Sequence, residues 1–576
     1  MDNKHVFLGS EKVTRTCENP IPQVTAPSLE LDRCLSMSMA TSVMPPWISL
    51  LPREELLYLY AAAVAVTAWC AVRALEWAWW RPRRLDRALR SQGLRGTAYR
   101  PVAGDTPLMQ RLNKEARSRA MPLGRGCHDI VPRAMPLFHR AMQEHGKISF
   151  TWFGPVPRVT ISKPELVREV LSNKFGHFEK LKFGRLQRML HNGVGSHEGE
   201  KWAKHRRIIN PAFHMEKLKR MLPAFATCCT ELVERWEGLA LAAGDAPCEV
   251  DVWPDMQNLT GDVISRAAFG SSYLEGRRIF QLQGEQLELV TLAMSKLHIP
   301  GYMLLPTKAN RRMKQIAGEI ERVLRGIIAK RESAMRAGEA TSDDLLGLLL
   351  ESNMAHCRDD SNAGTGITTD EVIGECKLFY FAGAETTSVL LTWTLILLCM
   401  HPEWQDRARE EVLRVLGPDG TPDHDGLGRL RVVAMVLHEA LRLYTPLTAI
   451  HRETYKPMEL GGVRYPAGVV LTLPLLCVHH DREVWGADAD EFRPERFAEG
   501  VSGAAAAPAF FPFGWGPRVC VGQNFAMLEA KMGIAAVLRR FSLQLSPDYT
   551  HAPFPVGMLQ PQHGAQLRLK SLLDHM

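Results

Sequence analysis

The sequence lacks the glycine patterns with which nucleotide-binding enzymes hold phosphate groups. Five Gly-x-Gly pairs occur, starting at residues 124, 193, 364, 426 and 514, and none has the third glycine of G-x-G-x-x-G. No G-x-x-x-x-G-K-[ST] segment occurs either. The backbone amides of such loops bind pyrophosphates and triphosphates. The sequence therefore offers no motif for a nicotinamide cofactor, a flavin or a nucleoside triphosphate.

Closely spaced cysteine pairs are also absent. The 12 cysteines among 576 residues include no C-x-x-C pair, which argues against zinc knuckles and thioredoxin-type sites. A chain of this length does not need a disulfide scaffold to build its core. We interpret most of the cysteines as small, buried apolar residues in a reducing compartment.

Neither sign of charge dominates the composition. The chain has 70 Lys and Arg against 63 Asp and Glu, a net charge of +7, and this excess is too small to indicate a nucleic-acid partner. Hydrophobic residues make up 46% and charged residues 23%, which is ordinary for a globular protein. These values exclude a disordered chain, a collagen-like chain and a multi-span transporter, and they leave a core large enough to enclose a cofactor.

One long apolar run lies near the N-terminus. Residues 56–72 carry no charge, and the apolar character continues to Trp80. As a helix, residues 56–80 would be about 37 Å long, enough to cross a hydrocarbon core of about 30 Å. This pattern favours a transmembrane anchor. A cleaved signal peptide and a buried amphipathic helix are the alternatives, and the late, long run fits the former poorly.

The charges on either side of this run predict its orientation. Residues 1–55 carry five Lys and Arg against seven Asp and Glu, whereas residues 81–100 carry seven arginines against one aspartate. Because positive charge accumulates on the cytoplasmic side, we expect a single-pass protein whose C-terminal part faces the cytoplasm.

The rest of the chain predicts a mainly α fold with small β-sheets. We expect a disordered tail at 1–55, which is a candidate start-site extension, the anchor at 56–80, a basic linker at 81–105 and one large domain at 106–576. Helical periodicity is found at 137–145, 164–172, 199–208, 213–239, 256–268, 307–336, 342–352, 369–400, 402–416, 427–444 and 522–540. Strand-like runs lie at 148–153, 157–162, 452–456, 468–473 and 565–569.

The most informative segment is F-G-W-G-P-R-V-C-V-G at residues 513–522. Two glycines and a proline favour a tight, rigid loop, and the helix that follows places Cys520 just before a helix N-terminus. The dipole and the free N–H groups there stabilise a thiolate and lower its pKa. Such a thiolate can be a nucleophile or an axial ligand of haem iron, and a structural cysteine is the plain alternative.

This segment resembles the F-x-x-G-x-R-x-C-x-G haem-binding signature of the cytochrome P450 superfamily, with every fixed position filled. The resemblance implies the P450 fold, with Cys520 as the axial ligand of haem b. A cysteinate pushes electron density onto the iron and favours O–O cleavage. The resemblance also implies that Arg518 pairs with a haem propionate, that Phe513 packs near the sulfur and that Gly522 belongs to the cofactor-binding loop.

A second motif lies in the helix expected at 369–400. Glu385 is the only charge in its last 23 residues. A second membrane span is the alternative, but a mid-span glutamate beside hydroxyl groups is costly in lipid. The segment A-G-A-E-T-T at 382–387 resembles the family's (A/G)-G-x-(D/E)-T-(T/S) oxygen-activation motif. The resemblance implies that Glu385 and Thr386 are the acid–alcohol pair that delivers protons to dioxygen.

Further matches to the family carry structural and haem-binding roles. Glu439 and Arg442 stand at i, i+3 on one helix face, and P-E-R-F at 494–497 supplies Arg496. The resemblance implies that these three form a buried ion triad that fixes the loop leading to the cysteine. It also implies that three more residues face the haem propionates: Trp202, Arg206 and Arg452.

The resemblance covers residues 85–572, and a finer likeness points to the plant clan numbered seventy-two. It is carried by F-Y-F-A-G-A-E-T-T-S at 379–388, L-S-P-D-Y-T-H-A-P at 545–553 and L-Q-P-Q-H-G-A-Q-L at 559–567. The resemblance implies O2 as co-substrate, an NADPH–cytochrome P450 reductase as electron donor and an endoplasmic reticulum location. The docking surface is expected near the cysteine, and a plain solvated basic face is the alternative. Its candidate positive charges are Lys204, Arg207, Lys531, Arg539 and Arg540.

The substrate is expected to be a lipophilic small molecule in an apolar pocket. The related plant family oxidises isoprenoids, including triterpenes, gibberellin-type diterpenoids and a secoiridoid, so the resemblance implies a terpenoid. Core packing is the alternative role of each candidate pocket residue. These residues are Phe381, Ala382, Leu447, Ile450 and Met558.

Three functions remain open at this point. The favoured one is a haem-thiolate monooxygenase that inserts one oxygen atom of O2 into its substrate. A haem-thiolate isomerase or dehydratase would consume peroxides without a reductase, but it has no need of the Glu385–Thr386 pair. A membrane-anchored protein that binds haem or sterol without catalysis would tolerate the loss of that pair.

Overall fold

The structure is a computed structural model that describes residues 53–572, apart from gaps at 125–127, 174–175, 183, 191, 245, 272, 295, 297–298, 340–343, 359–365 and 505. The tail expected at 1–55 lies almost wholly outside the described residues. The chain divides into two compact units between Arg73 and Ala74.

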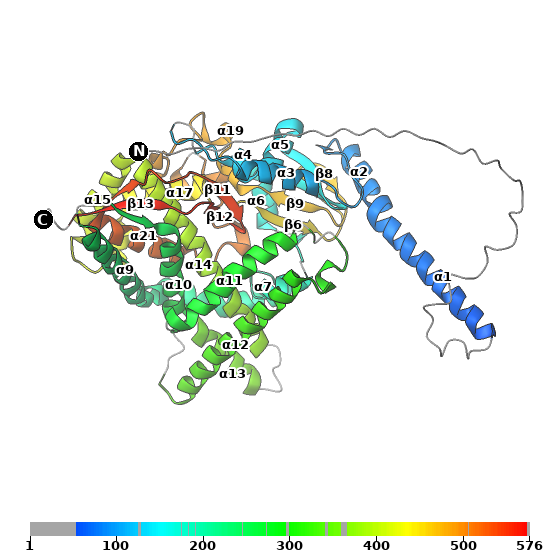
Figure 1. The fold of residues 1–576 in the computed structure, drawn as a ribbon, viewed down its shortest axis with the longest axis horizontal. Helices are drawn as coiled ribbons and strands as arrows, with labels where there is room; N and C mark the ends of the chain where they lie inside the picture. The colour runs from blue at the N-terminus through cyan, green and yellow to red at the C-terminus, as the bar shows by residue number, and fades with distance from the viewer. Residues whose placement is uncertain are drawn as a thin grey trace, which may run out of the picture. The chain divides into compact units, whose positions relative to one another are not determined.

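Helix α1 (Arg53–Leu75), drawn in blue in Figure 1, contains the apolar run near the N-terminus. A π-helical turn (Glu76–Trp80) follows it. The helical stretch Arg53–Ser91 is long and apolar enough to cross a membrane, and none of its most apolar window is buried. Its exposed large side chains include Leu57, Tyr58, Leu59, Tyr60, Val64, Val66, Trp69 and Val72.

The larger unit consists mainly of helices, as the sequence predicts. They are α2 (Arg81–Ser91), α3 (Thr106–Arg117), α4 (Val131–Ala134), α5 (Pro136–His145), α6 (Pro164–Ser172), α7 (Gly184–Leu190), α8 (Gly199–Ile209), α9 (Met215–Ala243), α10 (Val252–Phe269), α11 (Tyr273–Met294), α12 (Lys308–Arg336), α13 (Leu345–Arg358), α14 (Thr369–Met400), α15 (Pro402–Leu416), α16 (His424–Arg429), α17 (Arg431–Leu443), α18 (Leu475–His479), α19 (Arg482–Trp485), α20 (Gly500–Gly503) and α21 (Gln523–Arg540).

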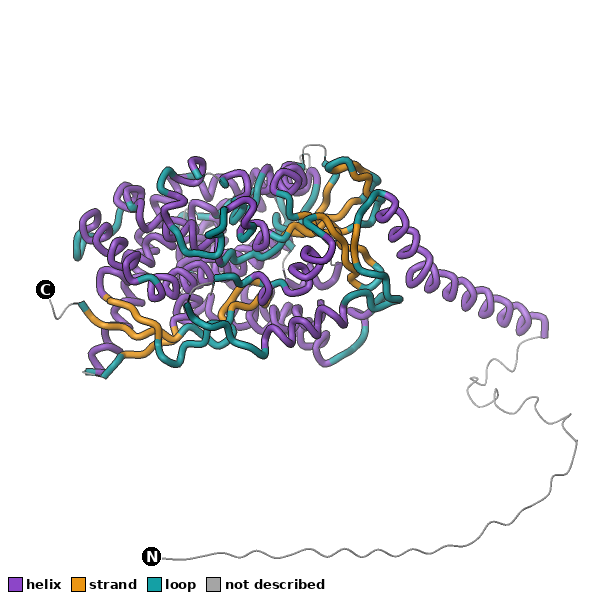
Figure 2. Tube along the Cα trace, turned by 90° about the horizontal axis from the view of Figure 1, so that it is seen from above, coloured by secondary structure: helices purple, strands orange, loops and turns teal. Residues whose placement is uncertain are grey.

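Small β-sheets complete this unit, and Figure 2 shows the largest gathered at one side of it. The six-stranded sheet has the order β1-β2-β3-β9-β6-β4, the three-stranded sheet β10-β13-β5, and two hairpins pair β11 with β12 and β7 with β8. The strands are β1 (Arg95–Gly96), β2 (Ile148–Phe153), β3 (Val156–Ile161), β4 (Phe178–Glu179), β5 (Cys248–Asp251), β6 (Ile450–Thr454), β7 (Met458–Leu460), β8 (Val463–Tyr465), β9 (Val470–Leu473), β10 (Phe541–Leu545), β11 (Pro553–Val556), β12 (Met558–Pro561) and β13 (Gln566–Ser571).

Helix α14 forms the centre of the core. The Thr368 hydroxyl accepts the Glu371 N–H at 3.2 Å and the Glu371 carboxylate accepts the Thr368 N–H at 2.9 Å, so a capping box starts the helix. The helix packs on α10, α17 and α21 (Figure 1). Its most apolar window is 72% buried, so the core helix is confirmed and the second membrane span is excluded.

One difference from the predicted elements concerns residues 427–444. The sequence predicts one helix there, but the chain forms α16, breaks at Leu430 and starts α17 at Arg431. The Glu411 carboxylate of α15 accepts the N–H groups of Arg431, Val432 and Val433 at 2.8, 2.9 and 3.0 Å. A side chain from a neighbouring helix therefore caps α17. The helical periodicity of residues 427–444 does not predict this cap.

Helix α11 was missed altogether. Its sequence contains Gly276 and Gly284, which disfavour a helix by about 1 kcal/mol each relative to alanine. Packing against α10, α12 and α14 outweighs that preference. A Cβ at Gly276 would lie 2.3 Å from the Ser265 hydroxyl of α10, so this glycine allows the two helices to approach closely.

Candidate functional site

Cys520 lies in a loop whose shape depends on glycine. Gly514 and Gly516 have φ values of 76° and 71°, in the left-handed region that favours glycine. A Cβ at Gly516 would come within 2.7 Å of the Leu171 carbonyl oxygen of α6, so no larger residue fits without movement. The Cys520 N–H donates to the Phe513 carbonyl at 2.9 Å. These constraints place the thiol at one position, two residues before the N-cap of α21.

The Cys520 side chain keeps accessible surface although protein surrounds it closely enough to raise the pKa of its thiol. Burial is the main cause, and the Gly522 N–H and the Arg206 charge lower the pKa by less. The predicted lowering by the helix end is therefore wrong as a net effect, because desolvation outweighs it. An accessible thiol in enclosed surroundings indicates an internal cavity, and a bound metal ion would deprotonate such a thiol outright.

A cluster of buried and half-buried cations lies beside this loop. It consists of Lys180, Arg206, Arg452 and Arg518, and Glu198 is its one carboxylate among the described residues. Burial and the neighbouring arginines lower the pKa of Lys180 to about 7, and burial followed by Arg518 lowers that of Arg452 to about 10. Several like charges in one enclosed space repel one another. The cluster therefore has an excess of positive charge, most of which a dianionic group would neutralise.

The individual contacts of the cluster leave donors free for such a group. Arg518 pairs with Glu198 and stands 4.6 Å over the Trp202 ring, and its Nη1 is buried without a partner. Arg206 Nη1 donates to the Val519 carbonyl at 3.0 Å, one residue before Cys520. The two propionates of haem b fit this set of donors in charge and in chemistry.

Lys180 was missed by the sequence analysis. Its backbone N–H donates to the Glu198 carboxylate at 2.8 Å, and its Nζ donates to the Gly195 carbonyl. A lysine between short strand-like residues belongs to no motif of the family that we used. Its role is indicated only by the three-dimensional structure, in which charges from α8, β6 and the cysteine loop surround it.

The middle of α14 opens onto accessible space. Phe381, Ala382, Glu385 and Thr386 are half-buried, whereas most of the turns on either side are buried. Accessible surface in the middle of a core helix indicates an enclosed cavity. The predicted oxygen-activation motif therefore faces that space, together with two of the candidate pocket residues.

The motif's own contacts suit a proton-transferring role. Burial raises the pKa of Glu385 to about 7, which lets this carboxyl group both give and take a proton near neutral pH. The Thr386 hydroxyl donates to the Ala382 carbonyl at 2.7 Å, one turn earlier in the helix, and this bond fixes its oxygen. A Cβ at Gly383 would lie 2.8 Å from the Ile264 side chain. That glycine lets α10 pack directly against the motif.

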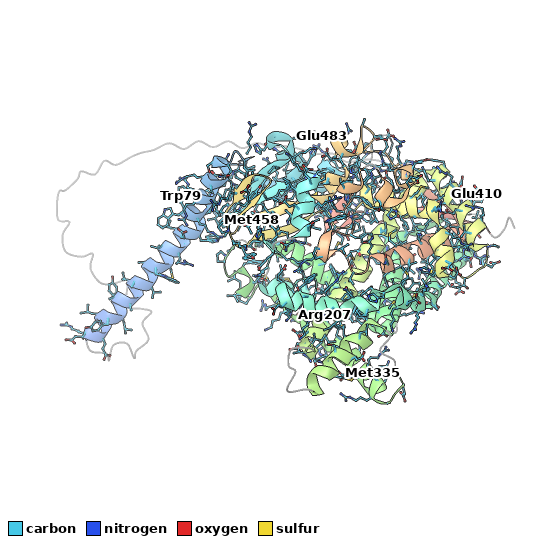
Figure 3. All side chains as sticks on the ribbon, turned by 180° about the vertical axis from the view of Figure 1, so that it is seen from behind. Trp79, Arg207, Met335, Glu410, Met458 and Glu483 are labelled. Atoms are coloured by element: carbon cyan, nitrogen blue, oxygen red, sulfur yellow. The ribbon has the colours of Figure 1, made fainter. Side chains whose placement is uncertain are left out.

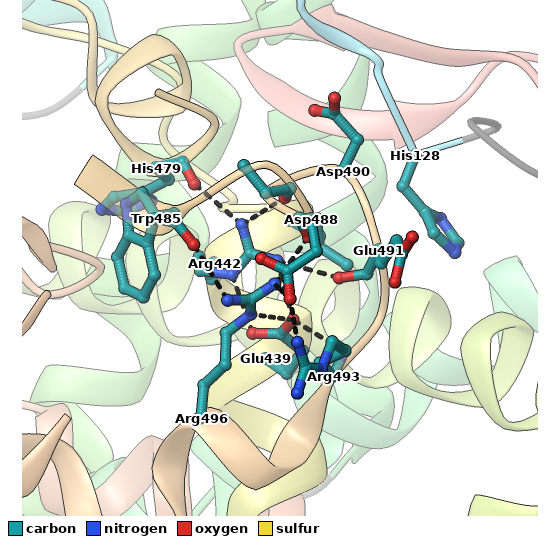
Figure 4. Close-up of polar contacts among 12 residues, drawn as sticks. His128, Glu439, Arg442, His479, Trp485, Asp488, Asp490, Glu491, Arg493 and Arg496 are labelled. Carbon is teal, nitrogen blue, oxygen red and sulfur yellow. Dashed lines mark hydrogen bonds and ion pairs between the residues drawn. The ribbon is translucent and has the colours of Figure 1, made fainter. Parts of the chain in front are cut away.

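The three residues of the predicted ion triad lie together (Figure 4), with Glu439 and Arg442 fully buried and Arg496 half-buried. Arg442 donates to both Glu439 oxygens, at 2.8 and 2.7 Å, and both side chains have no exposed surface. Arg496 Nε lies 3.5 Å from Glu439, and the Arg493 N–H donates to the same carboxylate at 2.9 Å. Arg496 also pairs with Asp488 at 3.0 Å.

Arg442 extends this network to the backbone of the segment that precedes the cysteine loop. Its Nη1 donates to the carbonyls of His479 and Ala489 at 2.9 and 2.7 Å, and its Nη2 to that of Glu491 at 3.1 Å (Figure 4). One guanidinium thus satisfies three buried carbonyls from two turns of chain.

The remaining candidate pocket residues come from two segments that are bonded together. They are Leu447, Ile450 and Met558, of which Leu447 is exposed and the others half-buried. The Leu559 N–H donates to the Pro446 carbonyl at 3.0 Å, and the Leu559 carbonyl accepts the Trp393 indole N–H at 2.8 Å. These bonds hold β12 beside α14 and beside the segment after α17.

A further buried cluster, missed in the sequence, joins α8 to α14. His205 Nδ1 lies 2.6 Å from the Glu375 carboxylate, which also accepts the Val194 N–H at 2.7 Å, and His197 packs on His205. Two ligands of one metal ion, each about 2 Å from it, stand roughly 3 Å or more apart. The shorter separation indicates a hydrogen-bonded pair that fixes the helix carrying Trp202 and Arg206.

Comparison with known proteins finds matches over most of the chain. The family model described as Cytochrome P450 matches residues 132–569. Cytochrome P450 CYP72A616 of Paris polyphylla is 59% identical over 515 residues, which is 89% of this chain and 98% of that protein. Cytochrome P450 72A15 of Arabidopsis thaliana is 51% identical over 513 residues, with the same shares covered.

A solved structure shows the same fold at lower sequence similarity. The retinoic-acid-bound cyanobacterial CYP120A1 matches with a TM-score of 0.68 and 23% identity, over 83% of this chain and 99% of that one.

Proposed function

Because the chain belongs to the cytochrome P450 family, whose members are haem monooxygenases, we propose that Cys520 is the axial ligand of its haem iron. One observation carries this assignment. An accessible thiol, fixed by a glycine-dependent loop, lies beside four buried or half-buried cations, with Glu198 as the one carboxylate of the cluster among the described residues. Haem b supplies the iron at which O2 is activated, with electrons that derive from NADPH.

The chain's own residues hold and orient that cofactor. Arg206, Arg452, Arg518 and the newly found Lys180 provide the positive charge for the propionates, and the Trp202 indole lies under the Arg518 guanidinium. The φ values of the loop glycines set the direction of the thiol. Further contacts with the haem are proposed for Phe513 and Gly522, which close the two ends of the loop.

On the other side of the site, Glu385 and Thr386 supply protons. Glu385 exchanges a proton with the Thr386 hydroxyl or with water in the cavity, because its pKa of about 7 lies close to the working pH. The Thr386 hydroxyl is held by its bond to the Ala382 carbonyl. This arrangement supports delivery of protons to O2 during insertion of one oxygen atom.

An NADPH–cytochrome P450 reductase is the proposed electron donor. Of the predicted docking charges, Lys531 and Arg539 donate to backbone carbonyls and Arg540 pairs with Asp419. Arg207, labelled in Figure 3, is exposed on α8, and Lys204 stands one turn from it. The docking proposal therefore depends most on these two residues.

We assign the membrane anchor to residues 56–80, within the exposed apolar stretch that begins at Arg53. The basic segment at 81–105 then lies on the cytoplasmic side of the endoplasmic reticulum membrane, and residues 106–576 form the catalytic domain. Residues 1–55 remain assigned as a tail. The exposure of α1 supports this organisation, since apolar side chains of this number are unfavourable in water.

The proposed substrate is a lipophilic isoprenoid. The candidate pocket residues Phe381, Ala382, Ile450 and Met558 are apolar and half-buried, which suits an apolar ligand. The cyanobacterial structure of the same fold is bound to retinoic acid, a molecule of this chemical kind. Triterpenoids and gibberellin-type diterpenoids are the first candidates.

Reconstitution tests this function directly. The full-length protein, the reductase and NADPH are incubated with a panel of triterpenoids and diterpenoids, and NADPH oxidation and product are measured together. Reductase-dependent formation of a product that is heavier by one oxygen atom supports the proposal. The proposal would be contradicted if the protein converted a hydroperoxide without the reductase and converted none of the panel compounds when the reductase was present.

A further inference from the structure

His479 stands between the ion network and the cysteine loop. It is the last residue of α18 and has no exposed surface. Its carbonyl accepts Arg442 Nη1 at 2.9 Å, and its ring Nε2 accepts the Phe511 N–H at 3.0 Å. One residue is therefore bonded to the network on its backbone side and to the start of the loop on its ring side.

From Phe511, two short steps lead to the thiol. The Phe511 carbonyl accepts the Gly514 N–H at 3.0 Å, which closes the first turn of the loop. The Phe513 carbonyl accepts the Cys520 N–H at 2.9 Å. The position of Cys520 thus depends on a turn whose first residue is held by His479.

The ring of His479 must be neutral to hold Phe511. Nε2 can accept an N–H only when it carries no proton, which places the single proton on Nδ1. Burial, followed by the charges of His480 and Arg442, keeps the pKa of His479 well below its usual value. Nδ1 is buried and has no partner among the described residues, so within that part of the chain the Phe511 bond is the one ring hydrogen bond that this imidazole makes.

We propose that His479 is a positioning residue for the haem ligand, which transmits the rigidity of the Glu439–Arg442 network to the loop that carries Cys520. The inference rests on the proposed role of Cys520. The ion triad itself has no hydrogen bond to residues 511–522 in the part of the chain that the structure describes. His479 supplies the link that the triad's expected function requires.

The test compares variants that differ in one hydrogen bond. His479→Leu replaces the imidazole with an apolar side chain of similar length and removes the Nε2 acceptor of the Phe511 N–H. His479→Gln places an amide oxygen near the position of Nε2, whereas His479→Asn is too short to reach Phe511. His480→Leu is the matched control, since His480 is also buried and bonds the Leu443 carbonyl at 2.9 Å but makes no bond to the cysteine loop.

The readout is the decay of the thiolate band in the reduced carbon monoxide spectrum, followed beside helical circular dichroism on the full-length holoenzyme. We expect His479→Leu and His479→Asn to lose the thiolate band about tenfold faster than wild type while helicity persists. His479→Gln should stay within about threefold of wild type. His480→Leu should lose thiolate band and helicity together.

Several results would overturn the proposal. One is a thiolate band in His479→Leu that decays no faster than the helical circular dichroism of that variant. Another is a thiolate band in His480→Leu that is lost before its helicity. If the leucine variant does not fold, equal decay of the glutamine and asparagine variants would also refute it. A wild-type protein with no thiolate band at all would instead refute the assignment of Cys520, so the two failures can be told apart.

Discussion

Arg442 and Glu439 form a two-bond ion pair in which neither side chain has any exposed surface. Each of these charges loses its hydration shell on burial, and the interaction with the partner compensates for that loss. Either charge would therefore be unfavourable in this position without the other. The arrangement explains how a short E-x-x-R segment on α17 can organise the polypeptide that leads to the cysteine.

Glu439→Gln is therefore expected to lower the free energy of unfolding by about 3–5 kcal/mol, because it leaves the buried Arg442 charge without its carboxylate partner. Arg442→Lys keeps the charge but removes donors that bond the carbonyls of His479, Ala489 and Glu491, so it should also lower the free energy of unfolding. Denaturant unfolding of the purified variants measures the change. Arg407→Lys, in the exposed pair of Arg407 with Glu495, is the control and should change stability little. Equal stability of Glu439→Gln and wild type would contradict the burial of the pair.

Gly516→Ala should destabilise the cysteine loop. The substitution combines a left-handed φ of 71° with a Cβ 2.7 Å from the Leu171 carbonyl oxygen, and together these cost about 3 kcal/mol. The melting temperature and the thiolate band of the carbon monoxide complex should both fall. Gly500→Ala is the control, since Gly500 has a φ of 75° and open space around it, and it should lose only the smaller backbone contribution.

The stability of the protein should depend on pH through Glu385. Burial raises the pKa of this carboxyl group from 4.5 to about 7, so its contribution is fully present below pH 4.5 and is lost as the pH rises through 7. The loss is at most about 3 kcal/mol. The free energy of unfolding should differ less between pH 6 and pH 8.5 in Glu385→Gln than in wild type. An unchanged difference would mean that Glu385 does not change its protonation state between these two pH values, which would contradict the raised pKa.

Glu385→Gln should also separate NADPH consumption from product formation. Loss of the acid group removes a proton donor, and general acid catalysis contributes about a hundredfold or more. We expect the yield of product per NADPH to fall at least about tenfold, with NADPH oxidation retained. Glu495→Gln, on the surface, is the control, and an unchanged yield in Glu385→Gln would contradict the proposed proton transfer.

Lys180→Met should weaken haem retention. The substitution removes one of the cations that surround the proposed propionate site, and a hydrogen bond to a charged group is worth about 1.5–3 kcal/mol. Transfer of haem to an excess of apomyoglobin should therefore be about tenfold faster or more. Lys182→Met, which removes a surface lysine that pairs with Glu179, should transfer haem at the wild-type rate.

Local patterns in the sequence were sufficient for the motifs and for most helices. The cap at Thr368, the glycine-dependent loop before Cys520 and the i, i+3 pair of Glu439 with Arg442 each depend on residues close together in the chain. Their geometry follows from backbone conformation and helix spacing, so the sequence alone could place them.

Contacts between distant segments could not be predicted in this way. Glu411 breaks the helix expected at 427–444 from a neighbouring helix, and Lys180 joins the cation cluster from a loop with no motif. The net pKa shift of Cys520 also depends on how tightly other segments enclose it, which exceeds the effect of the helix end. Burial is a property of the whole fold, and a local pattern does not contain it.

The most direct test of this account is the carbon monoxide difference spectrum of the reduced protein, recorded for wild type and Cys520→Ser side by side. The account predicts the strongly red-shifted Soret band of a thiolate–haem complex in wild type and its loss in the variant. A wild-type protein that binds no haem, or a band that Cys520→Ser leaves unchanged, would contradict the central claim.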